Sequence, residues 1–87
     1  MVAVRTLADL GRAVMLTRKS QGLTQEQAAA LCGVSMPFMN SLEGGKRVNI
    51  SLSKVMQVLD ALGMRLELSG VPHAPDGQAA LQDGRRS

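Results

Sequence analysis

The sequence predicts an all-α domain of four to five helices that ends in a single β-strand. Its 87 residues are 45% hydrophobic but contain one aromatic residue, Phe38. The core must therefore be built from aliphatic side chains, which favours helices over an all-β fold. Hydrophobic residues recur at helical spacing up to residue 62, and the spacing changes to two in residues 64–68. A chain of this length forms one small domain at most.

The first predicted helix runs from about residue 7 to residue 21, with Thr6 as its N-cap. Gly22 ends it. Its inner face should carry Leu7, Leu10 and Val14, which are spaced at i, i+3 and i+7. Residues 1–5 ahead of this helix could be extended or frayed, and the sequence does not decide between these states.

Residues 24–46 predict two short helices joined by a tight turn. Thr24 and Gln27 form a capping box, because each side chain can bond a backbone N–H of the other residue. Gly33 ends this helix, since a glycine adopts the left-handed conformation of a sharp turn without steric cost. Ser35 caps the helix that follows at once.

The second helix of this pair should end at Gly44 and Gly45. Its inward side chains should be Val34, Met39 and Leu42. The small side chain of Ala29 lets the two helices cross closely. Together with the turn at Gly33, these spacings indicate a DNA-binding helix-turn-helix, whose second helix enters the major groove. The alternative is an ordinary helical hairpin in a small bundle, which uses the same caps and apolar faces.

A loop with two adjacent cations, Lys46 and Arg47, follows, and it would lie beside the groove. The last helix should begin after Ser51 and end at Gly63. Its inner face should carry Leu52, Val55, Leu59 and Leu62.

Residues 64–68 alternate between apolar and charged side chains and predict a strand. One face carries Met64, Leu66 and Leu68, and the other carries Arg65 and Glu67. A strand needs a partner for its backbone groups, and the candidates are residues 2–4 and the same strand of a second copy. We expect the second copy, because antiparallel pairing across a two-fold axis places Arg65 near Glu67 and buries the Met and Leu side chains.

The predicted domain therefore spans residues 1–68. Residues 69–87 are rich in Pro, Gly and small polar residues and lack an apolar face, so we expect a flexible tail. The domain carries the whole net charge of +3. This charge suits a polyanionic partner, but many soluble domains are equally basic.

Other features of the composition exclude several kinds of function. The single Cys32 cannot form an internal disulfide or a multi-cysteine metal site, and we expect it to be a small buried filler near the turn. The chain has no nucleophile paired with a base and no phosphate-cradling loop, so we expect no enzymatic activity, metal or other cofactor. It has neither a membrane-length apolar run nor a signal peptide, which predicts a cytoplasmic protein.

These residues carry a family resemblance. Residues 10–46 are LGRAVMLTRKSQGLTQEQAAALCGVSMPFMNSLEGGK and resemble the Cro/C1-type, or xenobiotic-response-element, helix-turn-helix family. With VMQVLDALGMRLEL at residues 55–68, the chain resembles a HipB-type antitoxin. The resemblance covers residues 7–68. It implies a homodimer that pairs through the C-terminal strand, binds a palindromic operator of its own operon and holds a HipA-type Ser/Thr kinase toxin inactive. It also implies a tail that exposes the antitoxin to proteolysis.

The resemblance also assigns positions. Gln25 would meet a phosphate from the start of its helix. Lys46 and Arg47 would contact phosphates or simply be solvated. Many relatives carry Gln or Arg at positions 36 or 37, whereas this chain has Met36 and Pro37, so the operator sequence does not carry over. The candidate DNA-binding residues are Gln25, Ser35, Met36, Pro37, Asn40, Ser41, Lys46 and Arg47. The resemblance further places Arg18 opposite Glu43, where a cation near a helix C-terminus is favourable in itself.

The expected function is that of a sequence-specific transcriptional repressor and the antitoxin of a type II toxin-antitoxin pair. One alternative is a stand-alone repressor with no toxin. Another is a protein-interaction module that has lost DNA binding, since the usual base-reading side chains are missing at two positions.

Overall fold

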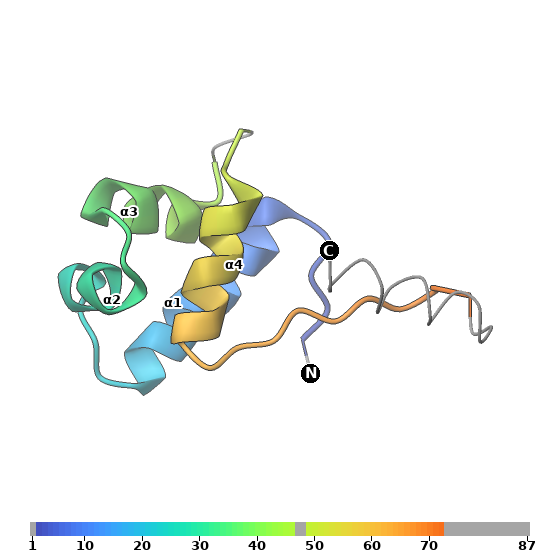
Figure 1. Cartoon of the computed structure of the whole chain (residues 1–87), viewed down its shortest axis with the longest axis horizontal. Coiled ribbons are helices and arrows are strands. Elements are labelled where there is room, and N and C mark those ends of the chain that lie inside the picture. The colour runs from blue at the N-terminus through green and yellow to red at the C-terminus, as the bar shows by residue number, and fades with distance from the viewer. Residues whose placement is uncertain (1, 47–48, 73–87) are drawn as a thin grey trace, which may run out of the picture.

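The computed structural model describes residues 2–46 and 49–72 and contains four helices in this part of the chain (Figure 1). The helices are α1 (Leu7–Ser20), α2 (Gln25–Cys32), α3 (Met36–Gly44) and α4 (Leu52–Ala61). The predicted all-α architecture is therefore confirmed, with four helices. None of the helices in these residues is long and apolar enough to cross a membrane.

All four predicted N-caps are confirmed. The Thr6 hydroxyl accepts the backbone N–H of Asp9, and the Asp9 carboxylate accepts the N–H of Thr6 in return. Thr24 and Gln27 form the same reciprocal pair at the start of α2. Ser35 and Ser51 accept backbone N–H groups from the first turns of α3 and α4. Each helix start is thus fixed by a local hydrogen bond that satisfies an otherwise unpaired donor.

The turn between α2 and α3 depends on a left-handed glycine. Gly33 has φ 72° and ends α2, and its N–H donates to carbonyls of the last helical turn. Ser35 begins the cap of α3 two residues later. This geometry is the sharp turn that the sequence predicts.

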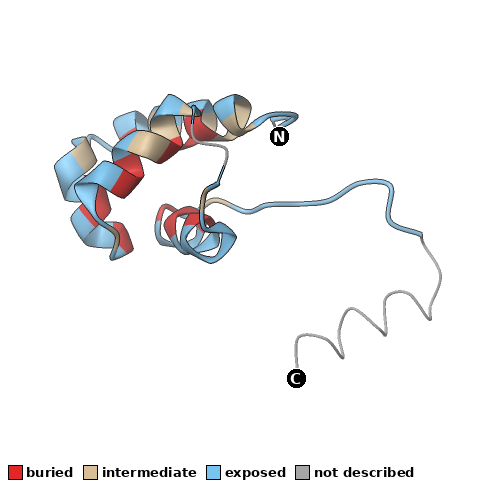
Figure 2. Ribbon diagram, turned by 90° about the horizontal axis from the view of Figure 1, so that it is seen from above, coloured by how far each residue is buried: buried red, intermediate tan, exposed pale blue. Residues whose placement is uncertain are grey.

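The core lies where the four helices turn their buried faces toward one another (Figure 2). Helix α3 packs against α1 and α2, and α4 packs against α2. The buried hydrophobic residues are Val14, Ala28, Ala29, Cys32, Phe38, Met39, Leu42, Val55, Val58, Leu59 and Leu62. The predicted filler role of Cys32 is confirmed, and the one aromatic residue, Phe38, also lies in this core.

The predicted inner face of α4 is wrong at one end. Leu52 is 66% exposed, whereas Val58 is fully buried. The buried stripe therefore follows Val55, Val58, Leu59 and Leu62 at i, i+3, i+4 and i+7. Leu52 stands at the edge of that stripe in the first turn of the helix, so it faces outward.

Helices α1 and α3 cross closely at Gly11 of α1. A Cβ built there would overlap the carbonyl oxygen of Leu42 and would lie 3.0 Å from that of Glu43. The backbones of α1 and α3 therefore meet directly. Sequence analysis placed the close crossing at Ala29, which is indeed buried, but did not identify Gly11. A lone glycine inside a helical pattern was the available signal.

Residues 64–69 form no strand in this single chain (Figure 1). The N–H of Met64 donates to the carbonyl of Leu59, and the Met64 side chain packs on the core. Residues 65–68 are exposed and lead away from the helices. Strand pairing needs a second strand, so pairing with another copy stays a prediction. Residues 73–87 of the predicted tail lie outside the described residues.

Candidate nucleic-acid interface

Helix α3 presents two polar and two apolar side chains on the face opposite the core. Met36 is 49% exposed, Pro37 and Asn40 are exposed, and Ser41 is half-buried. The opposite face holds the buried Phe38, Met39 and Leu42. The face predicted to read DNA is thus the accessible face of this helix.

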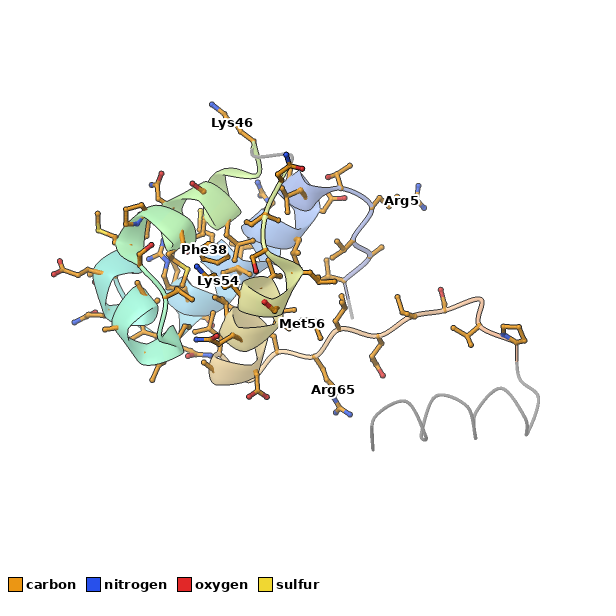
Figure 3. All side chains as sticks on the ribbon, turned by 45° about the horizontal axis from the view of Figure 1, so that its top comes forward. Arg5, Phe38, Lys46, Lys54, Met56 and Arg65 are labelled. Atoms are coloured by element: carbon orange, nitrogen blue, oxygen red, sulfur yellow. The ribbon has the colours of Figure 1, made fainter. Side chains whose placement is uncertain are left out.

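The loop after α3 places a cation next to this face. Lys46 is exposed and projects away from the helices (Figure 3). Together with Asn40, Ser41 and Gly44 it lines a shallow hollow at the end of α3. Lys46 therefore lies within the same surface as the two polar residues of the recognition face. Arg47, the other predicted phosphate contact, lies outside the described residues.

A chain of side-chain hydrogen bonds connects this surface to the interior. The Asn40 amide Nδ2 donates to Gln25 Oε1 at 3.2 Å. Gln25 Nε2 donates to Glu43 Oε1 at 3.0 Å. Glu43 in turn accepts from Arg18 through both oxygens, at 2.6 Å from Nε and 2.8 Å from Nη2. Three helices, α1, α2 and α3, are joined by these four side chains.

The pairing of Arg18 with Glu43 is confirmed. Their side chains are 9% and 3% exposed, so the ion pair is almost completely removed from water. The remaining Arg18 donor, Nη1, bonds the carbonyl of Leu23 at 2.7 Å. This bidentate geometry with a further carbonyl satisfies most of the guanidinium, which is what a buried pair requires.

The environment of Glu43 keeps its carboxylate ionised. Burial raises the pKa of Glu43, but the hydrogen bonds from Arg18 and Gln25 and the charges of Arg18 and Lys19 outweigh burial, so that the pKa lies below its ordinary value. At neutral pH, Glu43 can therefore accept hydrogen bonds but cannot donate one.

The predicted phosphate contact of Gln25 stays a prediction. One N–H of the Gln25 amide is used by Glu43, and its oxygen accepts from Asn40, which leaves the second N–H of Nε2 for a phosphate. The backbone N–H groups in the first turn of α2 offer further donors, because a helix start leaves them unpaired. The hydrogen bond between Gln25 and Asn40 was not predicted, although both residues were named as candidates.

Lys54 of α4 is a further residue that sequence analysis did not single out. Its Nζ lies 5.7 Å from the centre of the Phe38 ring. Asn49, Ile50 and Ser51 surround this contact. The cation lies over the ring of this buried aromatic residue at the start of α3 and so helps to join α4 to α3.

The comparisons with known proteins agree with this geometry. A family model described as a helix-turn-helix domain matches residues 3–69. The chain is also 38% identical over 65 residues to a protein of Sinorhizobium fredii (strain NBRC 101917 / NGR234) described as an uncharacterized HTH-type transcriptional regulator, y4mF. That match covers 75% of this chain and 84% of the relative.

Solved structures extend the comparison to the fold. A chain of the HipA-HipB-O2-O3 complex superposes with a TM-score of 0.71 at 21% identity, covering 83% of this chain and 100% of that one. The restriction-modification controller protein C.AhdI from Aeromonas hydrophila superposes with a TM-score of 0.60 at 30% identity, covering 68% and 84%. The chain therefore belongs to the helix-turn-helix domain family and has a HipB-like fold.

Proposed function

We propose that this helix-turn-helix DNA-binding transcriptional regulator represses its own operon as a homodimer on a palindromic operator. We further propose that it is the antitoxin of a type II toxin-antitoxin pair and neutralises a HipA-type kinase. The observation that carries the proposal is the exposed face of α3, held to the rest of the domain by the buried ion pair between Arg18 and Glu43.

The chemistry of α3 favours A·T base pairs under its exposed face. An Asn side chain matches the N6–H donor and the N7 acceptor of adenine, so Asn40 is the principal candidate for direct readout. Met36 makes only apolar contact, which suits the methyl group of thymine. Lys46, next to these residues, supplies a charge for the DNA backbone but no sequence information.

The exposed apolar residues near the C-terminus support a dimer. Leu66 and Leu68 in the predicted strand are 42% and 81% exposed, and Leu52 and Met56 of α4 are 66% and 44% exposed. Burying such side chains against a second copy is favourable at roughly 25 cal/mol per Å². A two-fold dimer also presents two copies of α3, as a palindromic operator requires.

The toxin partner is supported by the likeness of the fold to HipB in complex with HipA. The stand-alone repressor remains the second candidate. It is favoured by C.AhdI, which has a higher sequence identity to this chain and is described as a controller protein of a restriction-modification system. Co-purification with the product of the adjacent gene separates the two candidates. If a kinase co-purifies with the protein, the antitoxin function is supported. If the protein purifies as an operator-binding dimer without a kinase, the stand-alone repressor is supported.

DNA binding is tested by titrating variants on the upstream DNA of the gene and on random DNA. Asn40→Ala should relax specificity by roughly 1–3 kcal/mol. Lys46→Ala should weaken binding to all sequences alike and lower the salt slope by about one. Arg12→Ala, which removes an exposed cation of α1 outside the helix-turn-helix, is the matched control. If the wild-type protein binds the upstream DNA no better than random DNA, this protein is better described as a protein-interaction module that has lost DNA binding.

A further inference from the structure

We infer that Gln25 is a positioning residue that fixes the side-chain amide of Asn40 in one orientation, and thereby gives α3 its preference for adenine. The inference rests on the proposed DNA-binding function and deepens it. It assigns to Gln25 a role in base selection, in addition to any contact that the start of α2 makes with a phosphate.

The side-chain hydrogen bonds that lead from the buried Arg18 to Asn40 form a series, and Arg18 determines which group donates in each of them. The Arg18 guanidinium has donors only, and it holds both oxygens of an ionised Glu43. Glu43 can therefore only accept, so Gln25 must turn Nε2 toward it. The other end of the Gln25 amide is then an acceptor, Oε1. Asn40 must turn its donor, Nδ2, toward that oxygen.

This order leaves Asn40 with a defined pair of free groups. One N–H of Nδ2 is used by Gln25, while Oδ1 and the second N–H remain available on an exposed residue. An acceptor and a donor side by side match the N6–H and N7 of adenine. If the amide rotated by a half-turn, Oδ1 would face N7, and two acceptors would oppose each other. The hydrogen bond from Gln25 opposes that rotation.

A different result is expected if the hydrogen bond between Gln25 and Asn40 serves only to stabilise the fold. The hydrogen bond between Asn40 and Gln25 is exposed, and an exposed neutral hydrogen bond contributes little net stability because water replaces it. A structural role would therefore change stability slightly and would leave base preference alone. A positioning role would change base preference even where the fold is intact.

The test is selection of binding sites from a random DNA library by the full-length protein and its variants. Gln25→Met keeps the length of the side chain but removes both hydrogen bonds. The readout is the preference for adenine at the positions that Asn40→Ala relaxes. We expect Gln25→Met to lower that preference on the order of fivefold or more. Any lost phosphate contact would weaken all sequences equally and would cancel in this ratio.

Gln27→Met is the matched control, because it removes a glutamine from the same helical turn and breaks the capping box with Thr24. It should lower stability and leave base preference unchanged. A second readout uses the free protein: by NMR, the Asn40 side-chain N–H that donates to Gln25 should have a hydrogen-bonded shift in the wild type and in Gln27→Met. In Gln25→Met that shift should move to the value of a solvated amide.

The outcomes separate this inference from the proposed function. If the wild type selects no sequence, the proposed function fails and the inference fails with it. If the wild type selects a site but Gln25→Met keeps the same adenine preference, the inference alone is overturned. Unchanged Asn40 signals in Gln25→Met would overturn it as well. Loss of preference in Gln25→Met but not in Gln27→Met supports it.

Discussion

At the scale of single residues, Arg18 is a charged residue that the fold buries, at 7% exposure, together with the side chain of its partner Glu43. Its guanidinium bonds Glu43 twice and the carbonyl of Leu23 once, so it ties α1 to the end of α3 and to the loop before α2. Removing one partner of a buried ion pair leaves the other charge uncompensated. The stability of the domain should therefore depend strongly on this one residue.

Arg18→Ala should lower the free energy of unfolding by roughly 2–4 kcal/mol, because Glu43 loses its charge partner in a site with little water. Urea unfolding followed by circular dichroism measures the change. Arg12→Ala is the matched control, since it makes the same substitution at an exposed position of the same helix. An unchanged midpoint for Arg18→Ala would show that the ion pair contributes no net stability.

The lowered pKa of Glu43 predicts a loss of stability in acid. A carboxyl group whose pKa is lowered on folding stabilises the folded state above its ordinary pKa, which is 4.5 for Glu, and loses that contribution as the pH falls through the folded value. Stability should therefore decline below about pH 4.5. Asp9 also has a lowered pKa, caused first by the hydrogen bond from the Arg5 backbone, so its contribution is likewise lost in acid.

Glu43→Gln isolates the contribution of Glu43, because Asp9 remains. The variant should be less stable than the wild type at neutral pH, and its stability should fall less steeply in acid. Unfolding free energies between pH 3 and pH 7, a range chosen around the ordinary carboxyl pKa values, measure both effects. Equal slopes for wild type and variant would assign the acid sensitivity to other groups.

Sequence analysis predicted single residues better than the links between them. Asn40 and Gln25 were each named as candidates through the family resemblance. Their hydrogen bond could not be predicted, because it depends on the crossing of α2 and α3 and on two side-chain rotamers. The pairing of Arg18 with Glu43 came from family resemblance, since residues 25 positions apart give no local signal.

At the scale of elements, local chemistry explains why the helix starts were predicted correctly. A capping residue and its partner lie within three positions of each other, so the sequence alone contains the signal. The buried face of α4 was harder to predict from the sequence. Leu52 and Val58 are both apolar, and only the packing of the whole helix decides which one is buried. Close approach at Gly11 likewise involves α3, far along the chain.

Gly11→Ala should destabilise the protein by about 2 kcal/mol or more, because the new methyl group would overlap the backbone of α3 and force the helices apart. Gly44→Ala is a matched control within α3. Nothing lies within 4 Å of a Cβ at Gly44, so alanine should stabilise the helix by roughly 0.5–1 kcal/mol. Thermal unfolding of both variants measures the two changes. If Gly11→Ala is also stabilising, α1 and α3 do not meet at this position.

At the scale of the whole molecule, one chain accounts for the core but leaves apolar residues at its C-terminal end exposed. Met64 packs on the core, whereas Leu66 and Leu68 do not. The period of two in residues 64–68 was a clear sequence signal. A strand, however, exists only when another strand supplies its hydrogen bonds, so a strand that pairs only with a second copy would not appear in one chain.

Leu66→Pro should convert the dimer into a monomer, because proline cannot donate its hydrogen bond to the ladder and distorts the strand. Sedimentation velocity measures the change in mass. Operator affinity should collapse in parallel, since a monomer presents a single α3 and makes half of the contacts of a two-fold dimer.

Val71→Pro is the matched control for that variant, because residue 71 lies beyond the predicted strand and is equally exposed in the single chain. It should leave both mass and operator affinity unchanged. Circular dichroism should report intact helices in both variants, since residues 66 and 71 contribute nothing to the buried core. A Leu66→Pro protein that still sediments as a dimer would place the interface on another surface, with the exposed face of α4 that carries Leu52 and Met56 as the first to test.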